Sequence, residues 1–264
     1  MESRAIRALI LFAAVSLAAG SAFAAVREQT GTFAYHGLHQ RVTAHLALTG
    51  SNKLELEQYY KTSGTIVTRY MPVSGAAVHL FLVRDDFRTF THARPRMTQN
   101  GHFNVSIALD ANHRYYAYVD SFIAGIGEQT FRFTLQNGAP PHHLDVTLER
   151  PTNSAAAGPY RVTLSTARFR ANIPVTLSAT VTRGPRMIKP PKYKSFRTLA
   201  AMVNTGSLQY VSVYEGRAAG LWYPGEYDRP QIQLPALPPG LYRMWLMLTI
   251  ENTPYTAAFT LAAQ

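Results

Sequence analysis

Apolar and polar residues alternate with a period of two in many short stretches of this chain. Side chains on a β-strand point alternately to its two faces, so this period predicts strands with one buried face. Turn residues such as Asn100-Gly101 and Pro239-Gly240 separate the stretches and favour hairpins between neighbouring strands. The predicted strands include residues 40–48, 78–83, 103–109, 115–119, 129–135, 160–164, 175–181, 209–214, 241–250 and 255–261. We therefore predict an all-β fold of antiparallel sheets.

The length of the chain favours two sandwich domains over one. The 264 residues far exceed the roughly 100 residues of a single Ig-like sandwich. Residues 151–159 are small, polar and bear Pro and Gly, which is typical of a linker. We predict two tandem Ig-like antiparallel β-sandwich domains, residues 25–150 and 160–264, joined by this linker.

The two halves also repeat one another in the order of their elements. Residues 101–135 run from a strand through a turn and an aromatic strand to a closing strand. Residues 232–261 follow the same order, with Pro239-Gly240 at the turn. This order indicates a tandem duplication with a degenerate second copy. The alternative, that any two sandwich halves resemble each other in this way, stays open.

The N-terminus has the pattern of a secretory signal peptide. Arg4 and Arg7 precede an apolar run over residues 8–19, and Ala22-Phe23-Ala24 supplies a cleavage site. We expect residues 1–24 to be removed and the mature protein to be secreted, in the periplasm or outside the cell. No later stretch approaches the roughly 20 consecutive apolar residues of a membrane helix, so no transmembrane segment is expected in the mature protein. An anchor that is never cleaved is the alternative.

Composition narrows the chemistry that is open to this protein. There are 26 Lys and Arg against 15 Asp and Glu, giving a net charge of +11, and there is no Cys. The absence of Cys excludes disulfides, thiolate metal sites and cysteine nucleophiles. The sequence contains no serine-hydrolase elbow, phosphate loop, zinc-protease motif or dinucleotide fingerprint. We expect a non-catalytic binding protein, and no sequence-specific nucleic-acid partner.

Two histidines flank the pair Asp85-Asp86, which we predict to be a two-residue hairpin turn. That register places His79 opposite His92 and Phe81 opposite Phe90. Opposed residues have Cβ atoms about 4.5 to 5.5 Å apart, so two imidazoles could share Cu(II) or another divalent transition metal. All nine histidines precede the linker, and the candidates for a third ligand are His36, His39, His102 and His113. The alternative is a core histidine at position 79 that is hydrogen-bonded to the backbone.

Residues 77–120 resemble a family of secreted bacterial proteins with the pattern H-L-x-V-V-x-x-D-L-x-x-F-x-H-x-H-P, followed by G-x-F and by a tyrosine-bearing strand that ends in Asp. The matching positions are His79, Phe90, His92, Pro95 and Asp120. The resemblance implies tandem Ig-like or cupredoxin-like sandwiches and an association with heavy-metal or copper handling. Arg94 stands where the pattern has another histidine, which removes one implied ligand. The second half carries Gln209 and, approximately, Trp222 at the histidine positions.

A basic segment over residues 183–197 supports a second functional hypothesis. Its prolines interrupt helices and central strands, so we predict an extended loop projecting from the second domain. Such a loop could bind an anionic envelope surface or an acidic protein. The alternative is a solvated loop whose charge only keeps the protein soluble. Its cations, the candidate anion-binding residues, are Arg183, Arg186, Lys189, Lys192, Lys194 and Arg197.

Overall fold

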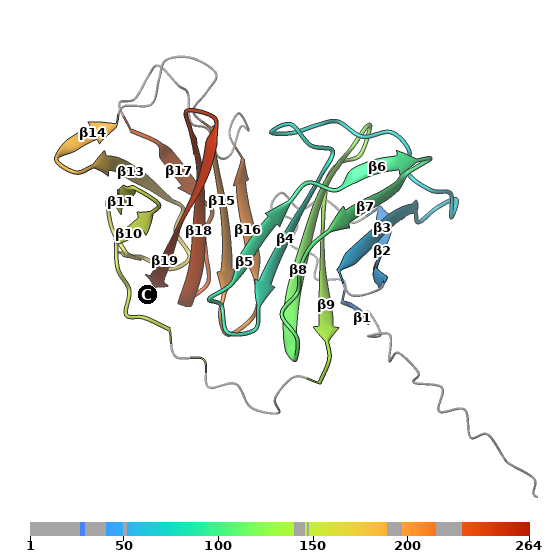
Figure 1. The fold of residues 1–264 in the computed structure, drawn as a ribbon, viewed down its shortest axis with the longest axis horizontal. Helices are drawn as coiled ribbons and strands as arrows, with labels where there is room; N and C mark the ends of the chain where they lie inside the picture. The colour runs from blue at the N-terminus through green and yellow to red at the C-terminus, as the bar shows by residue number, and fades with distance from the viewer. Residues whose placement is uncertain are drawn as a thin grey trace, which may run out of the picture.

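The computed structural model describes residues 27–29, 41–49, 52–139, 146, 148–188, 197–214 and 229–264. Within these ranges the chain forms strands and turns and no helix, which confirms the predicted all-β class. The described part therefore contains no helix long and apolar enough to cross a membrane. Two sandwiches lie side by side (Figure 1). The predicted signal peptide lies outside the described residues.

The first domain is a sandwich of two sheets. One sheet has the order β2-β3-β7-β6, and the other has the order β1-β9-β8-β4-β5. When the main strands are lettered along the chain, the orders β2-β3-β7-β6 and β9-β8-β4 match the A-B-E-D and G-F-C sheets of an Ig constant-type domain. The strands are β1 (Arg27–Gln29), β2 (Val42–Thr49), β3 (Lys53–Tyr60), β4 (Val78–Arg84), β5 (Phe90–Ala93), β6 (Arg96–Gln99), β7 (His102–Ser106), β8 (His113–Ile123) and β9 (Gly127–Asn137).

The second domain is also a sandwich of two sheets, and one of them repeats a strand order of the first domain. One sheet has the order β10-β11-β13-β14, with β17 also paired to β13, and the other has the order β12-β19-β18-β15-β16. The sheet β19-β18-β15-β16 corresponds to β9-β8-β4-β5 of the first domain. The strands are β10 (Ser154–Ala157), β11 (Tyr160–Leu164), β12 (Arg168–Phe169), β13 (Val175–Arg183), β14 (Arg186–Ile188), β15 (Arg197–Asn204), β16 (Tyr210–Tyr214), β17 (Gln231–Leu234), β18 (Gly240–Ile250) and β19 (Thr253–Ala263).

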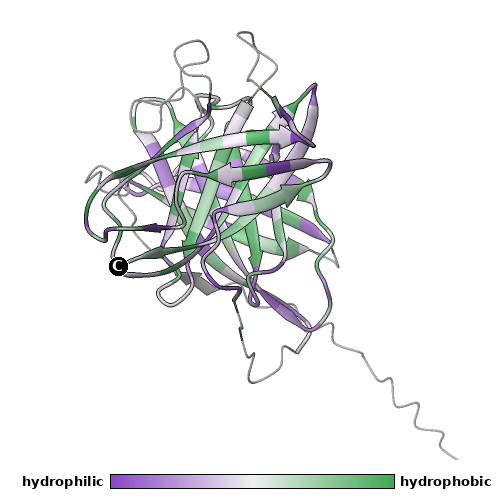
Figure 2. Ribbon diagram, turned by 90° about the vertical axis from the view of Figure 1, so that its left-hand side faces the viewer, coloured by the Kyte–Doolittle hydropathy of each residue, from purple (hydrophilic) through white to green (hydrophobic). Residues whose placement is uncertain are grey.

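Burial along the strands explains why these segments form sheets. In β3 and β9, buried and partly exposed residues alternate, as expected for a sheet with one face on a core. In β4, every residue before Arg84 is buried, because this strand is covered on both faces. Figure 2 shows the hydrophobic residues concentrated on the strands inside the molecule. Each sandwich has its own apolar core.

The region predicted to be a linker is partly built into the second sandwich. Strand β10 lies within residues 151–159 and pairs antiparallel with β11, with Ala157 opposite Tyr160. Gly158 makes the tight return between these strands with a φ of 58°. A chain of small residues can therefore continue a sheet edge where composition alone indicates a linker.

The β4–β5 hairpin differs from the predicted two-residue turn. Phe81 pairs with His92 and Val83 pairs with Phe90, so the loop spans residues 85–88. Inside this loop, Phe87 is buried and adopts a φ of 57°. Asp85 accepts hydrogen bonds from His113 and from the Arg114 backbone N–H, both 3.2 Å long. These anchors lengthen the loop and shift the register by two residues, which leaves every side chain on its predicted face.

Candidate functional site at the interface between the two sandwiches

A third hydrophobic cluster joins the two domains. It contains residues of β4 and β8 from the first sandwich and residues of β15, β16 and β18 from the second. The facing sheets are visible as neighbouring layers at the centre of Figure 1. Its buried members are Phe81, Val83, Phe87, Tyr118, Phe122, Leu199, Ala201, Val203, Tyr210, Tyr214 and Trp245. The strands in the middle of the molecule are therefore covered by their own domain on one face and by the other domain on the opposite face.

Aromatic rings form much of the contact between the domains. Phe90 stacks on Trp245 with ring centroids 4.6 Å apart and planes 11° apart. Tyr118 stacks on Tyr210 at 4.5 Å, and its hydroxyl donates a 3.1 Å hydrogen bond to the Leu208 carbonyl. Stacked aromatic pairs contribute about 0.5 to 1.5 kcal/mol beyond the burial of their area. The stacking therefore fixes the relative position of the sheets as well as excluding water.

A carboxylate lies within this interface. Asp120 is fully buried on β8 and accepts hydrogen bonds from Tyr214 at 2.6 Å, Tyr210 at 2.9 Å and Thr130 at 2.7 Å. Both tyrosines belong to the other domain. Burial, and then the charge of Asp120, raise the pKa of Tyr210 and Tyr214 well above the usual value, so both hydroxyls keep their protons. Hydrogen bonds to an ionised group are the strong ones, so this network ties the domains together.

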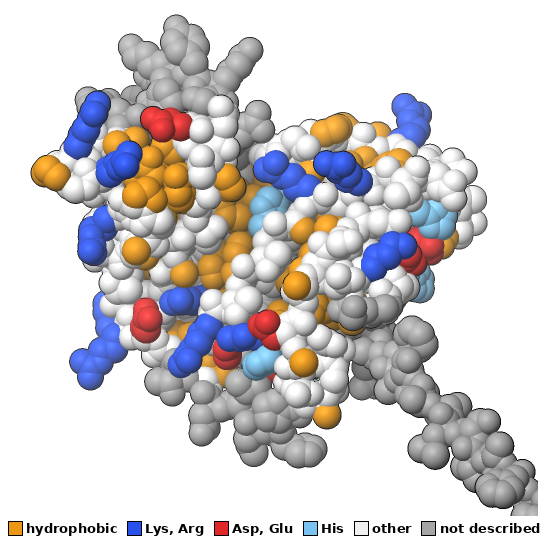
Figure 3. All heavy atoms as spheres, in the orientation of Figure 1, with side chains coloured by type: hydrophobic (Ala, Val, Ile, Leu, Met, Phe, Trp, Pro, Cys, Tyr) orange, Lys and Arg blue, Asp and Glu red, His pale blue; other side chains and the backbone are white. Residues whose placement is uncertain are grey.

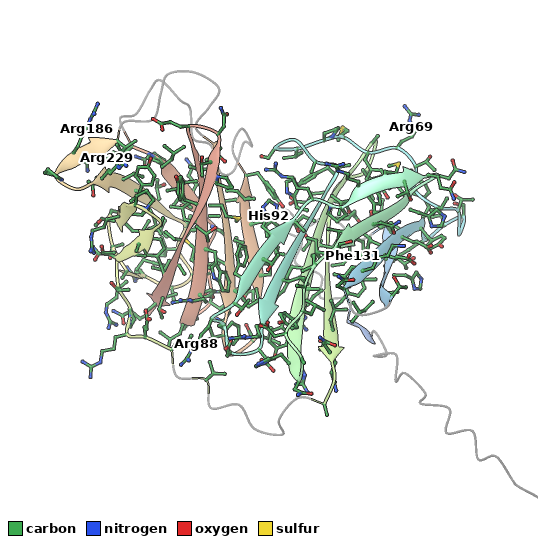
Figure 4. The ribbon with its side chains drawn as sticks, in the orientation of Figure 1. Arg69, Arg88, His92, Phe131, Arg186 and Arg229 are labelled. Carbon is green, nitrogen blue, oxygen red and sulfur yellow. The ribbon has the colours of Figure 1, made fainter. Side chains whose placement is uncertain are left out.

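The predicted proximity of the two histidines is found in the structure, although they are not directly opposed. His79 is fully buried, and its Nδ1 lies 2.9 Å from Nε2 of His92. Nε2 of His79 lies 2.8 Å from the Val73 carbonyl oxygen, which can only accept a hydrogen bond. His79 therefore donates to Val73, and in the neutral pair His92 donates to Nδ1 of His79. Figure 4 shows His92 at the boundary between the sandwiches.

This arrangement does not fit the predicted metal centre. Both ring nitrogens of His79 are already occupied by hydrogen bonds. Two nitrogens bound to one tetrahedral zinc ion would lie about 3.3 Å apart without a proton between them. Burial, the charge of His79 and the charge of Arg94 lower the pKa of His92 to about 3. The described residues instead show the hydrogen-bonded core histidine that stood as the alternative.

The candidates for a third ligand are not brought to this pair. His102 lies 2.7 Å from a carboxylate oxygen of Glu57 on the β2–β3–β7 sheet. His113 lies at the opposite end of β8 from Asp120, beside Asp85. His36 and His39 lie outside the described residues. Within the described ranges, no group of three or more His, Asp or Glu side chains could hold a metal ion.

The structure describes only part of the predicted anion-binding segment. Arg183 and Arg186 are exposed and lie opposite each other in the hairpin of β13 and β14, where Gly184 has a φ of 57°. The segment thus begins as an edge hairpin, in place of the extended loop predicted from its prolines. Arg197 opens β15, and Lys189, Lys192 and Lys194 lie outside the described residues. Figure 4 places Arg186 and Arg229 at the same end of the second domain.

The strand order of the two sandwiches defines the protein as a two-domain Ig-like β-sandwich protein, and comparisons with known proteins add little. No protein-family model and no curated protein sequence matches the chain. It is similar to a two-domain fibronectin type-III segment of chicken tenascin, with 11% identity, a TM-score of 0.25, and coverage of 84% of this chain and 98% of that one. It is also similar to fibronectin(III)-like modules of Clostridium thermocellum CbhA, with 11% identity, a TM-score of 0.23, and coverage of 84% and 94%. The fold assignment rests on the strand order.

Sequence reasoning missed the interface residues of the second domain. Tyr210 and Tyr214 are four residues apart in a strand, so both point to one face. In an isolated sandwich that face would be exposed to solvent. Two large aromatic residues on an outward face indicate a contact surface, and this was the signal that the sequence offered. Their acceptor, Asp120, is 90 residues before Tyr210 and 94 before Tyr214, so no local pattern connects them.

Proposed function

We propose that this chain is an exported, non-catalytic binding protein in which two Ig-like sandwiches act as one rigid scaffold. The observation that carries the proposal is the buried interface with Asp120 hydrogen-bonded to Tyr210 and Tyr214 across the domain boundary. The N-terminal pattern of residues 1–24 supports export. Ig-like sandwiches serve many functions, so the assignment as a scaffold rests on this interface and not on the fold.

The interface differs from the usual contact between domains of one chain. Domains commonly move relative to one another unless their interface is large and hydrophobic. Here the interface has its own buried cluster, and Arg132 adds contacts of 3.4 and 3.3 Å to the carbonyl oxygens of Ser207 and Leu208. A fixed relative orientation allows residues of both domains to form one composite binding surface.

Rotational diffusion measured by NMR relaxation tests the proposal. We expect the amides of both domains in the mature protein to report one rotational correlation time. Asp120→Ala should give the two domains different correlation times, because the buried hydroxyls of Tyr210 and Tyr214 lose their acceptor across the domain boundary. Thr130→Ser retains the hydroxyl and serves as the matched control. Two distinct correlation times in the unmodified protein would overturn the rigid scaffold.

A second candidate function is contact with an anionic envelope surface through the second domain. Residues 160–264 contain 12 Lys and Arg against 4 Asp and Glu, whereas residues 25–150 contain 12 against 10. The excess positive charge is thus concentrated in the second domain. The exposed pair Arg183 and Arg186 extends from this domain on the β13–β14 hairpin. Each basic residue near an anionic membrane contributes about 1 kcal/mol.

Vesicle sedimentation tests this second candidate. We expect the mature protein to bind vesicles containing phosphatidylglycerol and to be released as salt is raised, because exposed charge pairs are screened. Replacing Lys189, Lys192 and Lys194 by Ser should abolish the binding. Replacing Arg69 and Arg96 of the first domain by Ser is the matched control and should leave it unchanged. Binding that is insensitive to salt would contradict the candidate.

A further inference from the structure

A cavity of about 180 Å³ lies in the groove between the two domains. Its first wall comes from the first domain and contains Ser74, Phe90, His92 and Arg94. Its second wall comes from β15 and from the β18–β19 hairpin of the second domain. Figure 3 shows a histidine side chain at the surface of this groove, with Lys or Arg side chains beside it on the first domain. Cavities between domains are common positions for small-molecule sites.

The first wall supplies one fixed positive charge. Arg94 is exposed and forms no ion pair with any described residue. His92 beside it is neutral at ordinary pH, because its pKa is lowered to about 3. The ring of His92 is held in place by its hydrogen bond to His79, so its other nitrogen, Nδ1, is left to act as an acceptor. A guanidinium group binds carboxylates through two parallel hydrogen bonds.

The backbone at the edge of this wall is strained. Ser74 has a φ of 47° and precedes Gly75, which has a φ of 83°. A φ in this range is uncommon for a residue with a Cβ atom, and such strain is concentrated at functional sites. The turn is fixed by two hydrogen bonds between Val73 and Ala76, of 2.9 and 3.1 Å. It also positions the Val73 carbonyl that accepts the hydrogen bond of His79.

The second wall combines apolar side chains with hydroxyls. Leu199 pairs with Met247, which pairs with Thr256 in turn, so these three side chains share one face of the sheet. Thr249 pairs with Pro254 on the same face, two residues further along β18. Leu199 and Met247 offer an apolar surface, and Thr249 and Thr256 offer hydroxyl donors. None of the described residues that line the cavity is Asp or Glu.

We propose that this cavity binds a small organic carboxylate. The carboxylate pairs with Arg94, and the apolar body of the ligand rests on Leu199 and Met247. The volume lies below the roughly 300 to 1,000 Å³ of pockets for drug-sized ligands, so the ligand is small. The inference rests on the proposed rigid scaffold, because the two walls come from different domains and must keep their separation.

Chemical-shift titration of the isotope-labelled mature protein tests the proposal, with benzoate as the probe. Benzoate should shift the amide signals of residues around the cavity in a saturable manner. Benzamide, which has the same shape without the charge, should bind at least tenfold more weakly. Acetate should also bind more weakly than benzoate, because it lacks the apolar body.

Substitution of the guanidinium identifies the site. Arg94→Gln should weaken benzoate binding at least tenfold, whereas Arg96→Gln, a nearby exposed arginine that does not line the cavity, should leave the Kd unchanged. Equal loss in both variants, equal affinity for benzamide, or no saturation would overturn the carboxylate site. The same spectra give the rotational correlation times of both domains. A single correlation time with no benzoate binding refutes this site alone, whereas two correlation times refute the scaffold.

Discussion

The two facing sheets share a strand order but supply opposite chemical partners. In the register of the hairpins, Asp120 of β8 occupies the position that Met247 occupies in β18. By the same register, His79 corresponds to Leu199, and His92 corresponds to Ser212. The first domain thus contributes the carboxylate and the imidazoles, and the second contributes tyrosine hydroxyls.

This difference explains how two similar sheets can join without repulsion. Two identical sheets facing each other would bring like groups together, and two buried carboxylates repel. With Asp120 on one side only, Tyr210 and Tyr214 can donate to it. The different residues on the two facing sheets therefore make the interface complementary.

The register also corrects the predicted correspondence between the halves. The histidine positions of the first domain align with Leu199 and Ser212, and not with Gln209. Trp222 lies outside the described residues. The error arose because residues 197–204, which form β15, were not among the predicted strands, so the counterpart of the His79 strand was placed on residues 209–214, which include β16.

Trp245→Ala should break the interface most severely. The side chain is 1% exposed and stacks on Phe90, so truncation leaves a large cavity. We expect a loss of about 3 to 5 kcal/mol in the free energy of unfolding, measured by urea denaturation. The exposed Leu241→Ala on the same strand should change it by less than about 0.5 kcal/mol. Equal effects of the two substitutions would contradict the buried interface.

Removing the Asp120 carboxylate should lower the free energy of unfolding slightly less than Trp245→Ala does. Asp120→Ala leaves the hydroxyls of Thr130, Tyr210 and Tyr214 without their acceptor, and we expect a loss of about 3 kcal/mol. Tyr214→Phe should cost about 1.5 to 3 kcal/mol, since it removes one hydrogen bond to a charged group. In a double-mutant cycle, the loss of unfolding free energy in the double variant should be smaller than the sum of the losses in the two single variants. Strict additivity would show that the groups act independently.

The first domain should also make stability depend on pH. The pKa of His92 is about 3 in the folded protein and about 6.5 when unfolded, so the unfolded state binds the proton first as pH falls. The contribution is complete above about pH 6.5 and is lost progressively toward pH 3. Between pH 7 and pH 5 the free energy of unfolding should fall by about 2 kcal/mol from this residue.

His92→Gln provides the comparison for this pH dependence. The Gln amide can still donate to Nδ1 of His79 but does not titrate. Urea denaturation at pH 7, 6 and 5 should give a shallower decline in this variant than in the unmodified protein. Parallel declines would contradict the buried neutral imidazole. Residues 160–264 contain no histidine, so the second domain contributes no such dependence.

The smallest effect on stability is expected at the basic hairpin of the second domain. Arg183→Ser and Arg186→Ser alter exposed side chains, so the free energy of unfolding, measured by thermal denaturation, should change by less than about 0.5 kcal/mol. The paired positive charges should instead matter for binding to anionic vesicles. A loss of stability comparable to that of Asp120→Ala would show that the hairpin has a structural role.

The period-two pattern predicted most of the strands and the all-β class, because alternation of buried and exposed residues is a local property of each strand. It also placed His79 and His92 on one face, since a register shift of two residues preserves the face. The tertiary structure decided the loop over residues 85–88, which depends on the burial of Phe87 and on the contacts of Asp85 with β8.

The sequence by itself determined where most of the long strands form and which of their residues face inward, but it did not reveal β10, β14 or β15. Only the tertiary structure decided that a third core joins the domains and that Asp120 meets Tyr210 and Tyr214. The same packing filled the nitrogens of His79 with hydrogen bonds in place of a metal ion. The physical reason is that these contacts join residues far apart in the chain, and their energies depend on how two completed sheets meet.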